Sequence, residues 1–264
     1  MKQKKVNGKD VKRMAFIGIL VSVVYLLVNV GAGRADYDDN TGIRYSYQHS
    51  YAPLRTGQFQ LYYTGTYGTQ KSGDSILPNS TYLQQMGVSY GVTNHFDIEV
   101  YSTMPTGQAV NVNAPYSGGG SLRYYQATDY VDIAGLADYH NDWTGTSIYQ
   151  LTFILSKSIG RWNVTANGTA QHASAAHRDA VDMYFDAGTS YSVNRYFSFG
   201  VESYAADLEA TFNPDEAEGG TSLIISPALV FTLQEGVNFI VGPGVEDKNG
   251  KTSQMIRGNL TMTF

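Results

Sequence analysis

The last eight residues of the chain, RGNLTMTF (257–264), alternate polar and apolar side chains. Leu260, Met262 and Phe264 fall on one face of an extended chain, and the residues between them are polar. A period of two is typical of a β-strand with one apolar face and one wet face. Most chain termini are poorly ordered unless something holds them, so an aromatic ring at the last position needs a structural reason.

The same alternation recurs upstream in four stretches that turn back on themselves. They are MGVSYGVTNHFDIEVY (86–101), LTFILSKSIGRWNVTANG (151–168), FDAGTSYSVNRYFSFGVES (185–203) and ISPALVFTLQEGVNFIVG (225–242). In each, two alternating runs flank a tight polar or glycine turn: Thr93-Asn94, Gly160-Arg161, Asn194-Arg195 or Gln234-Glu235-Gly236. Longer polar stretches separate these units. The pattern predicts β-hairpins with short turns on one side of a sheet and long loops on the other.

Twelve strands satisfy this arrangement when a further turn lies near Thr128-Asp129. Their expected ranges are 57–69, 81–91, 95–104, 119–127, 130–140, 147–158, 161–172, 181–192, 195–206, 221–233, 236–246 and 253–264. An even number of strands, with both ends on the short-turn side, is the plan of a bacterial outer-membrane barrel. Closure would pair the first strand with the last and leave no exposed edge. Pro227 and Pro243 fall inside expected strands, where each removes a ladder hydrogen bond, and we expect bulges there.

Large aromatic residues recur where these strands reach the short turns, on the apolar face. They are Tyr90, Phe96, Trp162, Tyr191, Phe197, Phe231 and Phe264. Such a row is what an interfacial aromatic girdle of a membrane barrel requires. The alternative is a soluble sandwich or lipocalin-like barrel, whose strands also alternate but keep the apolar face inward. The residues therefore favour an all-β fold, a transmembrane antiparallel β-barrel of about 12 strands.

The first 35 residues differ from the rest of the chain. A basic start is followed by the apolar run MAFIGILVSVVYLLVNVGAG (14–33) and by small residues up to Ala35. This is typical of an export signal peptide cleaved near Ala35, although the apolar run is also long enough to approach a membrane-spanning anchor. We expect three parts: a signal peptide over 1–35, a periplasmic N-terminal segment or plug over 36–56, and the barrel over 57–264.

Charge and cysteine content limit the possible functions. Of the 18 Lys and Arg residues, seven lie in the signal segment together with one of the 23 acids, so 11 basic and 22 acidic residues remain, a net charge of -11. This balance argues against nucleic acid as a partner, because nucleic-acid binding depends on neutralising phosphates. With no cysteine, an exported chain has no disulfides, and its stability comes from packing or from a membrane.

The polar face of the predicted barrel collects more acids than bases. Its candidate lumen-lining residues are Asp97, Glu99, Asp132, Asp182, Tyr184, Asp186, Glu202 and Arg257, with Arg123 as a second positive partner. An acidic lumen favours cations or neutral solutes over anions. The alternative is a polar network that fills the lumen, as in many small barrels. The protein would then be a structural or adhesive barrel whose loops carry its function.

A third interpretation is an outer-membrane lipid hydrolase. His172 and Ser174 lie two residues apart, a spacing similar to the His-x-Ser of outer-membrane phospholipases, but the residues that follow are Ala175-Ala176 rather than Asn-Gly. No orienting partner for the histidine is evident in the sequence. His172 and His177 have no accompanying ligand spacing for a metal. We therefore expect no catalytic residues, no metal and no cofactor.

Several blocks resemble a known family. YGVTNHFDIEVY, ATDYVDIAGLADY, LSKSIGRWNVTANG and YSVNRYFSFGVESY look like recurring blocks of the outer-membrane family associated with the meta-pathway of phenol degradation, a similarity that spans about residues 57–264. Thr128 departs from the Gly-Asp common before the fifth strand of that family. The resemblance implies an outer-membrane channel or transporter that passes small, apolar or aromatic compounds and supplies no catalytic residues.

The end of the chain carries a second resemblance. Phe264 and the alternating residues before it look like the C-terminal signal that the outer-membrane barrel assembly machinery reads. The expected partners are therefore this machinery, outer-membrane lipid and lipopolysaccharide, and a small-molecule solute. The expected location is the bacterial outer membrane.

Overall fold

The computed structural model describes residues 53–68, 82–106, 117–141, 146–174, 181–206, 208, 222–248 and 251–264. In these ranges the chain forms twelve strands and no helix. The strands are β1 (Phe59–Gly68), β2 (Tyr82–Thr93), β3 (Phe96–Thr106), β4 (Ser117–Gln126), β5 (Asp132–Asn141), β6 (Ser147–Ile159), β7 (Trp162–Ala173), β8 (Asp182–Asn194), β9 (Phe197–Ala206), β10 (Ser222–Gln234), β11 (Val237–Lys248) and β12 (Lys251–Thr263). Every predicted strand is present, with ends within two residues of the expected ones.

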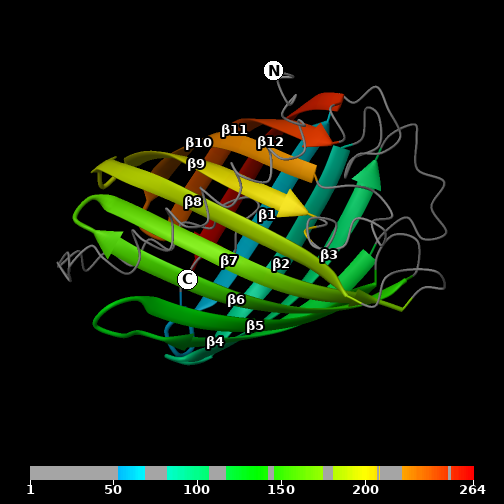
Figure 1. Ribbon diagram of the computed structural model, residues 1–264. Helices are drawn as coiled ribbons and strands as arrows, with labels where there is room; N and C mark the ends of the chain where they lie inside the picture. The colour runs from blue at the N-terminus through cyan, green and yellow to red at the C-terminus, as the bar shows by residue number, and fades with distance from the viewer. Residues whose placement is uncertain are drawn as a thin grey trace, which may run out of the picture.

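The strands form one closed antiparallel barrel, as predicted. Each strand pairs with its neighbours in sequence, and β1 pairs with β12 to complete the ring. Figure 1 shows the strands tilted and arranged around a common axis. At the closing seam, Phe59 and Phe264 exchange both backbone hydrogen bonds, at 3.2 and 2.8 Å. Because the ring is closed, each of these twelve strands has a neighbour on both sides and none is an edge strand.

Five short turns join β2 to β3, β4 to β5, β6 to β7, β8 to β9, and β10 to β11. Gly160 and Gly236 occupy two of these turns with φ values of 60° and 76°, in the left-handed region that favours glycine. At Gly236 a Cβ atom would also lie 2.5 Å from the carbonyl oxygen of Thr263. The Thr128 hydroxyl organises the β4–β5 turn, accepting hydrogen bonds from two backbone N–H groups. All five turns lie on one side, where the chain also enters β1 and leaves β12.

The two prolines of the β10–β11 hairpin do not mark bulges, so that expectation was wrong. Ile225 pairs with Val245 and Leu229 pairs with Val241, which is the same register on both sides of the prolines. The shift in this hairpin lies instead beside the turn, between Thr232 and Gln234. The ladder tolerates the prolines because they face each other, so the pairing is interrupted at only one place.

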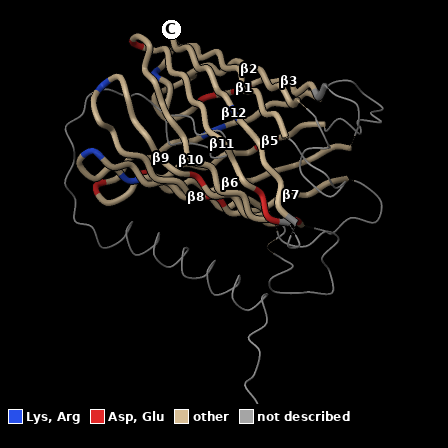
Figure 2. The backbone as a smooth tube through the Cα atoms, turned by 90° about the horizontal axis from the view of Figure 1, so that it is seen from above, with Lys and Arg blue, Asp and Glu red and all other residues tan. Residues whose placement is uncertain are grey.

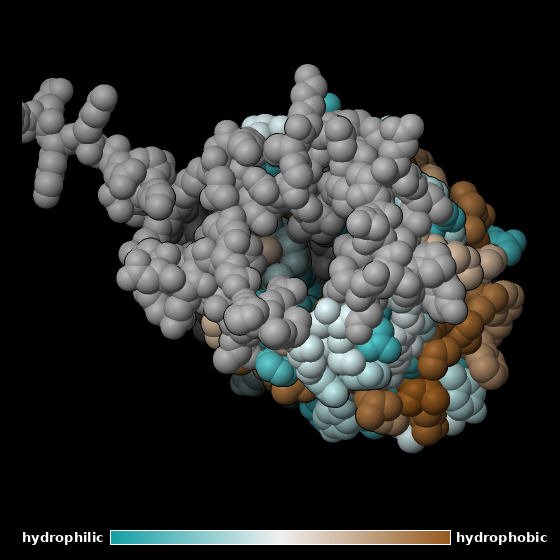
Figure 3. All heavy atoms as spheres, turned by 90° about the vertical axis from the view of Figure 1, so that its right-hand side faces the viewer, coloured by the Kyte–Doolittle hydropathy of each residue, from teal (hydrophilic) through white to brown (hydrophobic). Residues whose placement is uncertain are grey.

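The two faces of the wall differ in polarity. On β6, Leu151 is 66% exposed on the outer face, whereas Thr152 is 3% exposed on the inner face. The tan backbone in Figure 2 shows that charged positions are few along the strands. In Figure 3, hydrophobic residues cover much of the described outer wall, and paler or hydrophilic residues lie beside the central hollow. An apolar outside is the reverse of the polarity expected for a soluble barrel.

The expected signal peptide (1–35) and residues 36–52 lie outside the described residues. Residues 53–58 lie at the short-turn end of the barrel. Gly57 donates a backbone hydrogen bond to Gly91 at 2.8 Å, and the Thr56 hydroxyl donates to Asn94 at 3.1 Å. These contacts attach the chain to the β2–β3 hairpin before it enters β1. Among the described residues, no helix has the length and apolar character needed to cross a membrane.

Candidate functional site in the barrel interior

Contacts that skip a strand establish which side chains point inward. The Tyr62 hydroxyl on β1 donates to Glu99 on β3 at 2.8 Å, across β2. The Tyr101 hydroxyl on β3 reaches Asp138 on β5 at 2.9 and 3.0 Å, across β4. Side chains of next-but-one strands meet in this way on the concave side of a curved sheet. Tyr62, Glu99, Tyr101 and Asp138 therefore point into the barrel, and the period of two extends this assignment along each strand.

One wall of the interior is held by a buried charge network on β1–β4, centred on Arg123. The Arg123 guanidinium lies 2.7 Å from Glu99 and 3.6 Å from Asp97. The Tyr125 hydroxyl donates to Asp97 at 2.8 Å, and the Ser89 hydroxyl donates to Glu99 at 2.9 Å. Asp97 is 1% exposed, Glu99 8% and Arg123 3%. Charges this deeply buried require partners, so these two acids serve to hold the wall and do not form a free ring of carboxylates.

Four more predicted lumen residues lie together on β8 and β9, on the opposite side of the ring. Asp182, Asp186 and Glu202 are buried, and Tyr184 is partly exposed. The Gln171 amide donates to the Tyr184 hydroxyl at 3.0 Å and to Asp182 at 3.5 Å. The Tyr184 ring stacks on Tyr204, with centroids 5.9 Å apart and an interplanar angle of 20°. This wall combines acids with amide and phenol groups.

The remaining two predicted lumen residues lie on other strands, β5 and β12. Asp132 begins β5 at the short-turn end and pairs in register with Ser156. Arg257 lies on β12, between Thr66 of β1 and Gly242 of β11. The structure thus places six of the eight candidates on two opposite walls, β3 and β8–β9, and the other two on β5 and β12.

Some inward groups were missed in the sequence. Glu246 is 0% exposed in β11 and accepts hydrogen bonds from Ser222 at 2.8 Å and Ser253 at 2.9 Å. It is the last residue of the expected strand 236–246, but it was not among the candidate lumen residues. The signal available in the sequence was its two serine partners, Ser222 and Ser253, which lie at inward positions of the neighbouring strands β10 and β12.

Some apolar side chains also point into the barrel. This was not predicted, because the apolar face of every strand was expected to point outward. Ile154 packs with Tyr125 and Ala134, and Ile240 packs with Ala228 and Val230. Ile154 and Ile240 are 0% and 1% exposed. Ile154 lies between the inward-facing Thr152 and Ser156, so strict alternation along β6 would have found it.

The inward side chains that are partly exposed are mostly neutral. They include Thr64, Gln85, Gln150, Asn163, Gln171, Tyr184 and Tyr204, alongside Asp132, Asp138 and Arg257. Near the long-loop end, the His140 Nδ1 atom lies 2.6 Å from Asp138. The accessible inner surface therefore offers amides and hydroxyls as hydrogen-bond donors and acceptors, with only a few ionised groups.

The predicted girdle residues all lie on the outward phase at the short-turn end. Trp162 contacts Tyr191 with centroids 5.0 Å apart, and Phe197 contacts Phe231 at 5.4 Å. Tyr90 contacts Phe59 at 4.7 Å, and Phe96 is the register partner of Tyr124. Phe264 is 69% exposed, although its backbone is tied into the seam. The rings form neighbouring pairs across adjacent strands.

The histidine and serine of the hydrolase interpretation lie at the long-loop end of β7, and both are exposed. The His172 ring stacks on Tyr149 of the adjacent strand, with centroids 6.5 Å apart and an interplanar angle of 23°. The Ser174 backbone N–H donates to the Ser147 carbonyl at 2.8 Å. His172 is therefore held against an outward-facing aromatic ring.

Comparison with known proteins shows the fold. No family model matches the sequence, and no curated protein matches it. Among solved structures, a NanC porin has a TM-score of 0.57 at 14% identity, covering 76% of this chain and 98% of its own. A KdgM porin, solved in complex with disordered oligogalacturonate, has 0.55 at 10% identity, covering 78% of this chain and 99% of its own. The COG4313 outer membrane channel from Pseudomonas putida F1 has 0.51 at 11% identity, covering 80% of this chain and 97% of its own. The chain thus has the barrel fold of these porins and channels.

Proposed function

We propose that this protein is a bacterial outer-membrane channel through which small solutes pass passively, exported with a signal peptide cleaved near Ala35. The observation that carries the proposal is a closed twelve-stranded barrel with apolar side chains outside and polar side chains inside. In hydrocarbon, only a closed ladder leaves every backbone group of a sheet paired. The likeness to porins and channels supports the same conclusion.

The proposed placement in the membrane assigns the outer surface to lipid. The apolar band contacts outer-membrane lipid and lipopolysaccharide, and the aromatic pairs at the short-turn end lie at the headgroup level. The long loops then face outward from the cell and the short turns face the periplasm. Passage needs no cofactor and no covalent chemistry.

The inner surface indicates which solutes pass. Arg123 offsets part of the charge of Asp97 and Glu99, and most partly exposed inward groups are neutral. We therefore expect neutral solutes and cations to pass in preference to anions, because acids still outnumber bases in the interior. The resemblance to the phenol meta-pathway family favours small apolar or aromatic compounds within this class.

Purified protein in planar bilayers tests the proposal directly. We expect discrete single-channel steps with cation preference, and flux of neutral and aromatic solutes into liposomes that exceeds the flux of anions of similar size. A protein that is folded, as judged by a heat-dependent shift on gels, and yet gives no steps and no flux would overturn the channel function. Recovery in the soluble periplasmic fraction with no heat shift would overturn the membrane placement itself.

A second prediction concerns the chain end. Deleting Phe264 removes a girdle ring and the residue whose backbone pairs with Phe59, and we expect much less assembled barrel in the outer membrane. Each barrel that does assemble should conduct like the wild type, because the ring faces outward. Phe264→Tyr keeps an aromatic ring and serves as the control, with wild-type levels expected. Equal surface levels of the deletion and the wild type would contradict an assembly role.

One observation favours a second candidate, a structural or adhesive barrel with a filled lumen. Asp97, Glu202 and Glu246 point inward and are at most 2% exposed. Such deep burial is expected where side chains fill a small barrel. The bilayer experiment separates the two candidates, because a filled barrel gives no single-channel steps.

A further inference from the structure

The outer face of β4–β8 carries two rows of side chains that alternate in size. Successive register partners along the first row are Tyr124, Gly135, Phe153, Gly168 and Phe185. The second row, two residues along each strand, is Leu122, Ala137, Leu151, Ala170 and Met183. In both rows the large residues lie on β4, β6 and β8, and the small ones lie on β5 and β7. The surface is therefore a ridge along β6 with one groove over β5 and another over β7.

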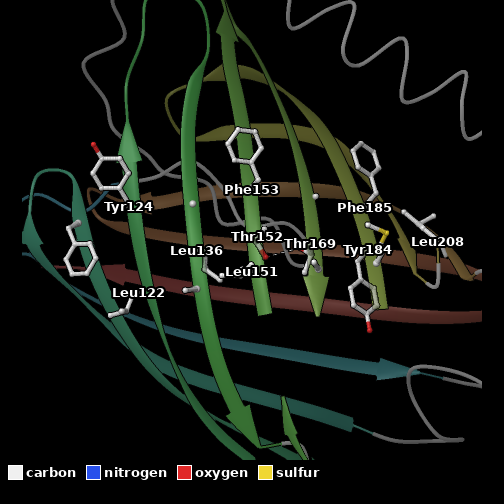
Figure 4. Close-up of a pocket in the computed structure, with 16 residues that line it drawn as sticks. Leu122, Tyr124, Leu136, Leu151, Thr152, Phe153, Thr169, Tyr184, Phe185 and Leu208 are labelled. Atoms are coloured by element: carbon white, nitrogen blue, oxygen red, sulfur yellow. Dashed lines mark hydrogen bonds between the residues drawn. The ribbon is translucent and has the colours of Figure 1, made fainter. Parts of the chain in front are cut away.

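The grooves are open. A Cβ atom added at Gly135 or at Gly168 would meet no heavy atom within 4 Å. The hollow over this face has a volume of about 740 Å³. Leu151 and Phe153, which form the ridge between the grooves, are 66% and 53% exposed. Figure 4 shows Phe153 standing on its strand, with Phe185 and Tyr124 on the flanking large-residue strands.

The hollow is apolar, and one end is covered. Leu208, which follows β9, donates its backbone N–H to the Met183 carbonyl at 3.1 Å and lies at the long-loop end. At the other end the Tyr124 hydroxyl already donates to Gln126 at 3.1 Å. The side chains of the two rows offer no other hydrogen-bonding group. An occupant is therefore held by dispersion contacts, which favours a hydrocarbon.

The width of the grooves selects among apolar occupants. Neighbouring strands are about 4.8 Å apart, so the large-residue strands on either side of a groove are separated by roughly 10 Å. An α-helix with its side chains is about 10–12 Å wide and would rest on the ridges, leaving the grooves empty. A polymethylene chain is narrow enough to lie between the ridges.

A second copy of the barrel also fits poorly. Two barrels in one membrane have the same strand tilt of about 35–45°, so strands that face each other across a two-fold axis along the membrane normal cross at roughly 70–90°. The β6 ridge of one copy would then cut across the grooves of the other and fill neither over its length.

We propose that this face binds one two-chain phospholipid, with one acyl chain over β5, the other over β7 and the β6 ridge between them. The inference rests on the proposed membrane placement, because the face must meet a bilayer. Two grooves flanking a single ridge match two chains joined at one headgroup. In lipid, where no hydrophobic driving force distinguishes one apolar surface from another, such close packing is what makes one site bind more tightly than its surroundings.

Filling the grooves tests the proposal. In the groove variant, Gly135→Leu and Gly168→Leu, both side chains enter open space, and leucine is better tolerated in a strand than glycine. The matched control is Gly118→Leu and Gly258→Leu, two outward positions beyond the grooves where the nearest atoms lie 3.6 and 3.8 Å away. Both variants should fold and retain the heat-dependent gel shift of the wild type.

Native mass spectrometry of protein extracted from membranes in mild detergent is the measurement. We expect the wild type and the control to carry one phospholipid on the monomer, and the lipid-bearing fraction to fall roughly tenfold in the groove variant. No adduct on the wild type, an equal adduct on all three proteins, or a loss in the control as well would overturn the proposal. If wild type and control show a dimer mass that the groove variant lacks, the occupant is a second copy of the chain. If the adduct has the mass of a free fatty acid or of lipid A, the occupant is that molecule. Either result would also overturn the proposal. Normal channel steps and heat shift alongside any of these results would leave the proposed function standing.

Discussion

The β1–β4 wall and the β10–β12 wall of the interior are stabilised differently, although both belong to the same closed sheet. In the first, Arg123 ties Asp97 and Glu99 together under two tyrosines and a serine. In the second, Ile240 packs with Ala228 and Val230, and Glu246 accepts hydrogen bonds from two serine hydroxyls. The first wall contains buried charge pairs and the second contains buried hydrocarbon. A side chain that points into the barrel therefore does not necessarily contact water.

Removing the cation from the first wall should have the largest effect. Arg123→Met leaves Asp97 and Glu99 buried without their ion pair, and breaking a buried pair on one side costs about 3–5 kcal/mol. We expect the free energy of unfolding to fall by that amount, measured by urea unfolding from lipid vesicles with tryptophan fluorescence. The triple variant Asp97→Asn, Glu99→Gln, Arg123→Met removes all three charges and should recover most of the loss. A triple variant no more stable than the single one would show that charge pairing does not hold this wall.

Truncating the packed wall should cost somewhat less. Ile240→Ala leaves a cavity beside Ala228 and Val230, and buried Ile→Ala changes cost about 2–5 kcal/mol. Leu229→Ala on the outer face is the control, since Leu229 is 44% exposed and lipid can fill the space it leaves. The same unfolding measurement should give a clearly smaller loss for the control. Equal losses would mean that the inner cluster contributes no special packing.

The smallest effect is expected at Glu246. Glu246→Gln keeps the shape of the side chain but replaces two hydrogen bonds to a charged acceptor with bonds to an amide, which we expect to cost about 1–2 kcal/mol. Glu235→Gln in an exposed turn is the control, with no measurable change expected. If Glu246→Gln stabilises the barrel, the carboxylate is kept for a reason other than stability.

The strands and their count were predictable because they depend on local signals. The period of two, the turn residues at Gly160 and Gly236 and the shared side of the short turns set the number of strands and their ends to within two residues. These signals persist because one residue of slip would move a whole strand's apolar set to the other face. At the β11 end, Glu246 was expected to end the strand, which continues to Lys248, because the polar residues there give no local contrast that marks the boundary.

The candidate site was less predictable, because its groups are set by which strands meet. The alternation of polar and apolar residues along the strands placed Asp97, Glu99, Asp186 and Glu202 in the interior. The contacts that separate these residues into two walls depend on ring closure and register. The inward isoleucines were missed for a different reason. Apolar side chains were assigned to lipid, yet an inner wall that packs against itself also needs hydrocarbon.

The alternation in RGNLTMTF (257–264) already determines a strand with Phe264 on its apolar face. Closure decides its partner: the ring brings Phe59, two hundred residues earlier, into exchange of both backbone hydrogen bonds with it. Register decides the ridge and grooves of β4–β8 in the same way, since Gly135, Phe153 and Gly168 are unremarkable along the chain and become neighbours only across strands. Side-chain periodicity is a property of the single extended chain, whereas pairing and curvature belong to the assembled sheet.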